Sequence, residues 1–388
     1  MTKKIVLVMT SPPIPFGKAD SHWYYVLLKE LVDRGHQVSA FVACETTEEI
    51  EQTQALFPSY DLHCYLYRPP AGLRGKWQSF RRPFSYVFSS EFQQALAERL
   101  AAPYDVLHLE QLWSSWLGLC HPEKTVVTVH YLFSEDRAFE SSDWRAKIYK
   151  WRSYGAERYL LRSLPRFIAL SDRLANRICE LHPGAIAHTI PLGFDLSHSP
   201  FSQIKPQQNR PVVGLIGNFG WMPTYSAAER LLTRLWSEIK AQVPTAQLQL
   251  VGRSARTRFA AFENHSDLAI YQDVPDIAPY FRQMDVLLYA PTAGSGMKVK
   301  VMESFAFGTS VVTTPEGVEG LPAKDGIHAG IAIDDRGLIE RTVALLNDPT
   351  RRETQRHNAR QLLEQVCSPT VTVTQVEQVY DAIIEANS

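Results

Sequence analysis

The sequence predicts two α/β domains in series, each built around a mostly parallel, doubly wound β-sheet. The length of 388 residues exceeds what one ordinary hydrophobic core serves, so two domains of roughly 190 residues each are expected. Apolar strand patterns alternate with helical patterns through both halves, which is typical of parallel sheets. A polar, proline-rich stretch over 195–211 separates the halves and has the composition of a linker.

The first half opens with a βαβ pattern. A strand over 4–10 is followed by a Pro/Gly loop, a helix over 20–34 that stops before Gly35, and a second strand over 37–43. Five further apolar runs predict strands with helices between them, at 62–67, 105–109, 125–129, 166–170 and 187–190. The first domain is therefore expected over 1–193.

A second α/β series begins after a linker over 194–211. Its predicted strands lie at 212–217, 247–251, 285–289 and 310–313, each followed by a loop and a helical pattern. This domain is expected to end at residue 368. The amphipathic helix near 371–386 is predicted to cross back and pack toward the first domain, as a separate segment over 369–388.

Composition excludes several classes of protein. A net charge of -1 gives no overall attraction to nucleic acid. The five cysteines are odd in number and widely spaced, which indicates buried thiols in a reducing compartment rather than a zinc or redox site. The first strand is too short for a signal peptide, and no stretch has the apolar length of a membrane span. We expect a cytoplasmic protein, with contact to the inner face of a membrane left open.

The segment over 288–303 carries the strongest chemical signal. A buried strand runs into a glycine-rich loop and then a helix, so backbone N–H groups and the helix dipole converge where a diphosphate would bind. Lys298 and Lys300 add positive charge, and Glu303 lies about one turn into the helix, within reach of ribose hydroxyls. A lone Gly-x-Gly equally fits a structural turn.

Several segments resemble glycosyltransferase family four, the large retaining family with the GT-B fold. The donor-site segment of that family resembles residues 300–321 here, and its interdomain element resembles 190–195. Strand ends of its second domain resemble 213–221, 250–253 and 273–281. In the first domain the resemblance is looser and involves the loop 15–18 and the strand end 128–130.

The resemblance implies a GT-B fold, with two Rossmann-like domains facing across a cleft, and a metal-independent transfer of a hexose to an acceptor hydroxyl with retention. The expected co-substrate is a UDP- or GDP-linked sugar, with no other cofactor, and no Asp-x-Asp metal motif occurs in the chain. His130 and Glu303 match the family's catalytic positions, His130 reaching the sugar. The matching donor-binding residues are Gly17, Asn218, Arg253, Val274, Gly294, Ser295, Gly296, Met297, Lys298, Val299 and Lys300.

The sequence departs from the family at two points. The family commonly has two glutamates with seven residues between them, and Ser295 stands where the first is expected. A hydroxyl and backbone amides would then hold the sugar. The basic pair usually found after the first glycine loop is also missing, since 217–226 contains no Lys or Arg. Arg253 and Lys298 are therefore expected to neutralise the diphosphate, ahead of Lys300.

Two stretches rich in basic and aromatic residues lie in the first domain, over 68–88 and 144–166. They suit a glycan or lipid-linked acceptor, or an anionic membrane surface contacted peripherally. Helices with solvated basic faces and aromatic side chains turned inward explain the same pattern equally well.

Other interpretations remain open at this point. His130 fits a capped core histidine, and Glu303 fits a surface ion pair with a lysine of its own helix. A nucleotide-sugar epimerase, a sugar-phosphate synthase or a non-catalytic binding scaffold would share this fold. A nicotinamide dehydrogenase fits less well, because Pro12, Pro13 and Pro15 stand where a glycine-rich turn belongs.

Overall fold

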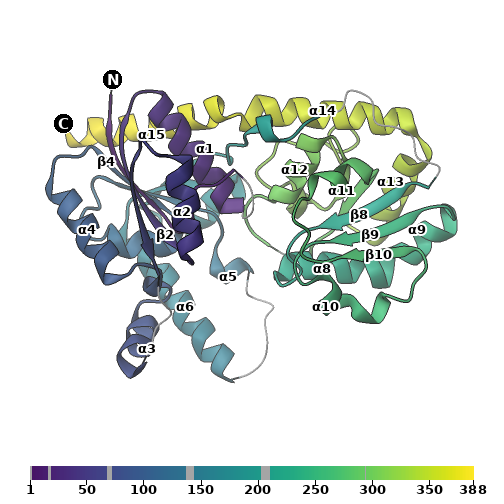
Figure 1. Ribbon diagram of the computed structural model, residues 1–388, viewed down its shortest axis with the longest axis horizontal. Coiled ribbons are helices and arrows are strands. Elements are labelled where there is room, and N and C mark those ends of the chain that lie inside the picture. The colour runs from purple at the N-terminus through teal and green to yellow at the C-terminus, as the bar shows by residue number, and fades with distance from the viewer. Residues whose placement is uncertain (1, 16–18, 68–71, 137–143, 202–209, 293) are drawn as a thin grey trace. The chain divides into compact units, whose positions relative to one another are not determined.

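The chain divides into two units in a computed structural model that describes residues 2–15, 19–67, 72–136, 144–201, 210–292 and 294–388. The first unit consists of Met1–Asp195 together with Pro369–Ser388, and the second of Leu196–Ser368. Figure 1 shows both units and labels many of their helices and strands. The C-terminal helix thus belongs to the first unit, although it follows the second unit in sequence.

The first unit is built on a seven-stranded sheet in which every strand pair is parallel, in the order β3-β2-β1-β4-β5-β6-β7. The strand order turns back at β1, so that β4 pairs with the opposite edge of β1 from β2. The strands are β1 (Lys4–Met9), β2 (Gln37–Cys44), β3 (Asp61–Leu66), β4 (Val106–Glu110), β5 (Thr125–Val129), β6 (Arg166–Ala169) and β7 (Ile186–Thr189).

Helices cover both faces of this sheet, as the alternation along β4 shows. Leu107 and Leu109 belong to the core shared with α4, α6 and α7, whereas His108 and Glu110 contact the opposite layer, formed by α1 and α15. The helices are α1 (Ala19–Asp33), α2 (Thr47–Leu56), α3 (Gly72–Arg81), α4 (Ser90–Ala101), α5 (Phe133–Asp136), α6 (Trp144–Ser163), α7 (Asp172–Leu181) and α15 (Pro369–Asn387).

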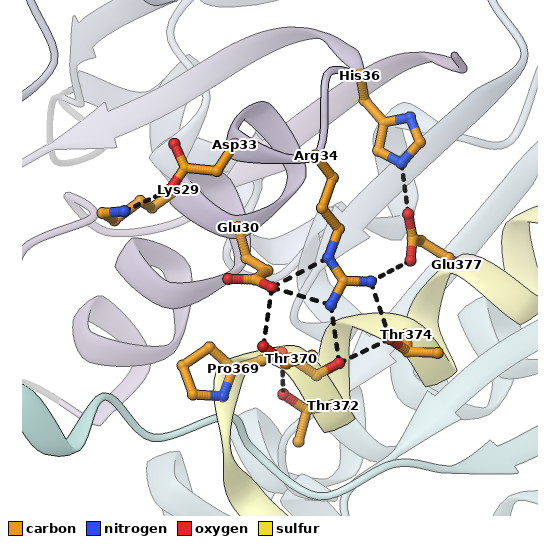
Figure 2. Close-up of polar contacts among 10 residues, drawn as sticks. All are labelled: Lys29, Glu30, Asp33, Arg34, His36, Pro369, Thr370, Thr372, Thr374 and Glu377. Atoms are coloured by element: carbon orange, nitrogen blue, oxygen red, sulfur yellow. Dashed lines mark hydrogen bonds and ion pairs between the residues drawn. The ribbon is translucent and has the colours of Figure 1, made fainter. Parts of the chain in front are cut away.

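A polar cluster fixes α15 to the end of α1 (Figure 2). The Arg34 guanidinium donates to Glu30 on α1 at 2.9 Å and to the Thr370 carbonyl at 2.8 Å, and it pairs with Glu377. His36 contacts the other oxygen of Glu377 at 2.6 Å. Burial alone would raise the pKa of Glu377, but the hydrogen bonds from His36 and Arg34 outweigh it and lower that pKa.

The second unit is also built on a parallel sheet, with six strands in the order β10-β9-β8-β11-β12-β13. Its strands are β8 (Val212–Ile216), β9 (Gln247–Val251), β10 (Leu268–Tyr271), β11 (Val286–Tyr289), β12 (Ser310–Thr313) and β13 (Gly330–Ile331). Its α-helices are α8 (Met222–Arg230), α9 (Trp236–Gln242), α10 (Ala255–Phe259), α11 (Ala278–Gln283), α12 (Val299–Phe307), α13 (Asp335–Asn347) and α14 (Pro349–Cys367).

The two predicted parallel sheets are confirmed, and no predicted strand boundary differs from the observed one by more than one residue. The sequence interpretation missed β10 and β13. Both are edge strands, β10 is only partly buried, and β13 has two residues, so neither shows a continuous apolar run. Part of the predicted linker, 202–209, and the predicted donor residue Gly17 lie outside the described residues.

We expect Glu377→Gln to lower the melting temperature of the first unit by about 2–5 °C at neutral pH, because loss of a half-buried, charge-assisted pair costs about 1–2 kcal/mol. A carboxyl whose pKa is lowered by folding stabilises the protein above its unfolded pKa and loses that contribution as pH falls. The difference from wild type, measured by thermal unfolding, should therefore shrink below about pH 4.

The matched control is Glu340→Gln. Glu340 pairs with Arg336 on an exposed helix surface, where an ion pair contributes little. An effect of Glu377→Gln no larger than that of the control at neutral pH would contradict the anchoring role of the cluster.

Candidate functional site

Four neighbouring strands of the second unit end at one edge of its sheet. Because β10, β9, β8 and β11 are adjacent and parallel, the loops after their carboxyl ends lie next to one another. The predicted donor residues of this unit all lie in these loops or on the helix that follows β11. Val274 follows β10, Arg253 follows β9, Asn218 follows β8, and residues 294–298 lead from β11 into α12.

Backbone hydrogen bonds join three of these loops closely. The Gly217 N–H donates to Val251 O at 2.9 Å, the Phe219 N–H to Arg253 O at 2.9 Å, and the Gly252 N–H to Tyr271 O at 2.8 Å. Gly252 has a φ of +134°, and a Cβ atom there would lie 2.0 Å from Gly217 O. Only glycine fits where the ends of β8 and β9 approach this closely.

The loop after β11 is held by its own lysine. The Lys298 ammonium donates to Ser295 O at 3.0 Å and to Gly296 O, and both the Lys298 and Ser295 side chains are buried. The N-cap residue of α12, Lys298, forms no side-chain hydrogen bond to the helix start at Val299. Unsatisfied N–H groups at a helix start bind anions, so this end of α12 is suited to a phosphate.

Lys300 and Glu303 place an amine and a carboxyl group in the first turns of α12. The Lys300 ammonium lies 4.5 Å from the centre of the Tyr289 ring, and its Cε would lie 3.0 Å from a Cβ at Gly217. Burial, and then the charge of Lys298, lower the pKa of Lys300 to about 8. Burial raises the pKa of Glu303 to about 7, against the opposing charge of Lys300. Two groups that titrate near neutrality on one helix are typical of a functional site.

Arg253 is an exposed cation at this edge. Among the described residues its side chain forms no hydrogen bond or ion pair, so its charge is available to a ligand. Asn218 is also exposed, and its Oδ1 accepts from the Gly220 N–H at 2.9 Å, which leaves the amide nitrogen to donate elsewhere. Val274 is half-buried. Gly294, Gly296 and Met297 complete the loop that leads to α12.

The first unit carries a separate polar site on a buried glutamate. Glu110, at the end of β4, is fully buried and contacts His130 Nε2 at 2.7 Å through Oε2. Its Oε1 accepts from Trp23 Nε1 at 3.0 Å and from the Thr128 hydroxyl at 3.2 Å. Burial alone would raise the pKa of Glu110, but the hydrogen bond from His130, the nearby His108 and the Trp23 donor together lower it.

A second carboxylate lies close by, where the strand order of the first sheet turns back. Asp20, at the start of α1, accepts from the Ser11 hydroxyl at 2.8 Å and from the Gln111 amide at 3.1 Å. Gln111 has a φ of +67°, a strained value for a residue with a side chain, and such residues cluster at functional sites.

The sequence predicted a role for His130 but not for Glu110, Asp20 or Gln111. A glutamate at the end of the apolar run 106–110 was the available signal for Glu110, because an unpaired carboxylate would not be tolerated on a buried strand.

The described ranges contain neither a cluster of metal ligands nor a helix that could span a membrane. No three His, Cys, Asp or Glu side chains there are grouped as metal ligands would be. No helix in the described part of the chain has both the length and the apolar character needed to cross a bilayer.

Both halves of the chain match known sequence families. Residues 22–198 match Glycosyltransferase Family 4, and residues 210–348 match Glycosyl transferases group 1. No curated protein matches the chain in sequence.

Solved structures with the same fold cover nearly the whole chain. Sucrose-phosphate synthase from Thermosynechococcus elongatus has a TM-score of 0.71 at 17% identity, covering 99% of this chain and 100% of its own. HepE from Anabaena, solved with UDP-glucose, has a TM-score of 0.67 at 13% identity, with 98% and 100% covered. WaaG, a glycosyltransferase involved in lipopolysaccharide biosynthesis, has a TM-score of 0.67 at 14% identity, with 98% and 99% covered.

We expect Gly252→Ala to destabilise the second unit by more than about 3 kcal/mol, because the new Cβ collides with a backbone oxygen and the φ value is strained. The control is Gly326→Ala, where φ is +75° but no atom lies within 4 Å of the new Cβ, so about 1 kcal/mol is expected. Thermal unfolding measures both. Similar losses in the two variants would show that the β8–β9 loops are not packed as described.

Proposed function

The chain belongs to the glycosyltransferases that combine a family 4 domain with a group 1 domain, and we propose that it transfers a hexose from a nucleoside-diphosphate sugar to an acceptor hydroxyl with retention and without a metal ion. The observation that carries this proposal is the carboxyl edge of the second sheet. There Arg253, whose side chain has no partner among the described residues, follows β9. The start of α12, where Lys298 makes no capping hydrogen bond, follows β11 of the same parallel sheet.

We propose that the diphosphate is held by Arg253 and by the N–H groups at the start of α12. Charge builds up on the diphosphate as the sugar departs, so fixed donors at this place lower the energy of the transition state. The Lys298 ammonium fixes the conformation of the loop 294–298 by donating to carbonyl oxygens of that loop. The positive charge of Lys298 remains close to the proposed phosphate position. Ser295 takes the place of the family's first glutamate, and a hydroxyl with neighbouring amides would hold the sugar.

Glu303 is proposed to bind the ribose. A carboxyl group with a pKa of about 7 accepts a hydrogen bond when ionised and donates one when protonated, and both suit a pair of vicinal hydroxyls. Val274, in the loop after β10, is proposed to contact the base. Relatives of the same fold were solved with UDP and with UDP-glucose, which supports UDP ahead of GDP as the nucleotide.

We propose His130 as the catalytic residue of the first unit. Its Nδ1 has no hydrogen-bond partner among the described residues, while Nε2 is committed to Glu110. In this family the leaving phosphate is thought to take the acceptor proton, so no separate general base is assigned.

A melting-temperature panel tests the donor assignment. We expect UDP or GDP to raise the melting temperature, since a ligand at about 100 times its Kd adds about 2.7 kcal/mol of stability. The shift in melting temperature should persist in the presence of EDTA. In Arg253→Ala the apparent affinity for the nucleotide should fall at least about 10-fold, because a charge-assisted contact is lost. Glu303→Ala should weaken binding of UDP more than binding of inorganic pyrophosphate.

The control for Arg253→Ala is Arg256→Ala, because Arg256 is exposed nearby but already paired with Glu263 at 2.6 Å. Equal affinities for UDP in the two variants, or a shift that EDTA abolishes, would sink the proposed donor site.

NMR of the product's anomeric proton decides whether the transfer proceeds with retention. Formation of a free sugar phosphate or an epimerised donor would instead favour one of the related nucleotide-sugar enzymes.

A peripheral membrane contact is proposed for the two basic and aromatic helices of the first unit. α3 and the N-terminal end of α6 extend beyond the rest of that unit (Figure 1), and Arg152 of α6 donates to Phe80 O of α3 at 2.7 Å. Several of their aromatic side chains are exposed, among them Trp77 at 62% and Trp151 at 73%, whereas Tyr154 packs against the core. Exposed tryptophans beside lysines and arginines suit an anionic lipid surface.

The positive charge of α3 and α6 also favours an anionic lipid surface as the partner. Glu157 is the one acidic residue on α3 and α6, and its side chain is buried. Lys76, Lys147 and Arg158 are exposed there. All five cysteines of the chain are free thiols, which supports a reducing compartment, and we propose the cytoplasmic face of a membrane as the place of action.

Vesicle flotation tests the membrane proposal. We expect the protein to float with vesicles that contain phosphatidylglycerol at low salt, and to stay behind with phosphatidylcholine alone. Replacing Trp77 and Trp151 by Ser should reduce partitioning by about 10-fold or more, because two interfacial aromatic anchors are lost. The control is Ile333→Ser, which removes an apolar side chain 83% exposed in the second unit. No flotation of the wild type with anionic vesicles would remove the proposal.

A further inference from the structure

A chain of buried hydrogen bonds runs from the C-terminal helix to His130. The Tyr380 hydroxyl lies 2.6 Å from His108 Nδ1, and His108 Nε2 lies 2.7 Å from Thr128 Oγ1. The Thr128 hydroxyl donates to Glu110 Oε1 at 3.2 Å, and Glu110 Oε2 lies 2.7 Å from His130 Nε2. Tyr380, His108, Thr128 and Glu110 are all fully buried, so water does not compete for these contacts.

Within this series of hydrogen bonds, the donors and acceptors fit only one direction of donation, from Tyr380 toward Glu110. Because Thr128 uses its proton on Glu110, its oxygen must accept from His108, which places the His108 proton on Nε2. His108 Nδ1 then accepts from Tyr380. At the other end Trp23, which has only a donor, occupies Glu110 Oε1 together with Thr128. The free carboxylate oxygen, Oε2, is left for the Nε2 proton of His130.

The protonation states agree with this direction. Burial, together with the nearby charge of Glu110, raises the pKa of Tyr380 well above its usual value, so that the hydroxyl keeps its proton. Burial lowers the pKa of His108, against the attraction of Glu110, and favours the neutral ring that the chain requires. The lowered pKa of Glu110 keeps that group ionised as the acceptor of all three of its donors.

We propose that Glu110 is a positioning residue that fixes His130 as the Nε2–H tautomer, and that Tyr380, His108 and Thr128 orient Glu110 from behind. The side chain of His130 is 10% exposed, and its Nδ1, partner-free within the described part of the chain, is left to face a ligand with a lone pair. A fixed tautomer and ring orientation are what a histidine that contacts a reacting group needs. Only the expected effect on turnover rests on the proposed catalytic role of His130; the assigned tautomer does not depend on it.

The tautomer is measurable without any ligand. Nitrogen chemical shifts of ¹⁵N-histidine-labelled protein, recorded at about pH 8.5 where free imidazole is neutral, distinguish a protonated from an unprotonated ring nitrogen. His130→Gln identifies the His130 signals. We expect the wild type to show a protonated Nε2 and an unprotonated Nδ1. The opposite pattern, or an even mixture, would overturn the proposal with no variant of Glu110 needed.

Glu110→Gln gives the sharper result. The glutamine oxygen stays with the donors Trp23 and Thr128, so the amide N–H group faces His130 Nε2, which must then accept. The proton should move to Nδ1, and kcat with the UDP-sugar donor should fall by about 10²-fold or more with a much smaller change in KM. An unchanged tautomer in this variant contradicts the assignment.

Glu157→Gln is the matched control. Glu157 is 1% exposed in the same unit and accepts from the Phe133 N–H at 2.6 Å, without contact to His130. It should leave the His130 signals unchanged, and an equal change in both variants would point to general loosening of the unit. Failure of every sugar donor to turn over would refute the proposed function, whereas the tautomer result would stand or fall by itself.

Discussion

Parallel strand pairing is the constraint on which the rest of this structure depends. Because every strand pair in both sheets is parallel, the carboxyl ends of the strands meet at one edge of each sheet. Polar groups that follow strands far apart in sequence are thereby gathered, Asn218 beside Arg253 in the second unit and Glu110 beside His130 in the first. The strand order turns back at β1 and at β8, and each candidate site lies at such a point.

The second site depends on backbone geometry more than on charged side chains. Three loops are joined through main-chain hydrogen bonds, and Gly252 permits an approach that any Cβ would prevent. Lys298 holds a loop and Lys300 lies against an aromatic ring, whereas the exposed Arg253 side chain has no partner among the described residues and is available to a ligand. The first site depends on a buried carboxylate whose desolvation is offset by Trp23, Thr128 and His130.

Much of the fold could be predicted from sequence, because long apolar strands and the helices between them are local patterns. The edge strands β10 and β13 could not, since their pairing partners rather than their own residues define them. The loop 294–298 could be predicted from sequence, because its glycines and lysine form a local pattern between a strand and a helix. Glu110 could not, because its importance depends on contacts with residues 87 positions before it and 20 after it. The family resemblance supplied His130, whereas only the structure shows what orients it.

The most direct measurement of the central claim is a crystal structure of the protein with UDP bound. The account predicts diphosphate oxygens within hydrogen-bonding distance of the Arg253 guanidinium and of the N–H groups at the start of α12, with the ribose hydroxyls at Glu303 and the uracil beside Val274. UDP bound at any other place, or a diphosphate that contacts neither Arg253 nor α12, would contradict it.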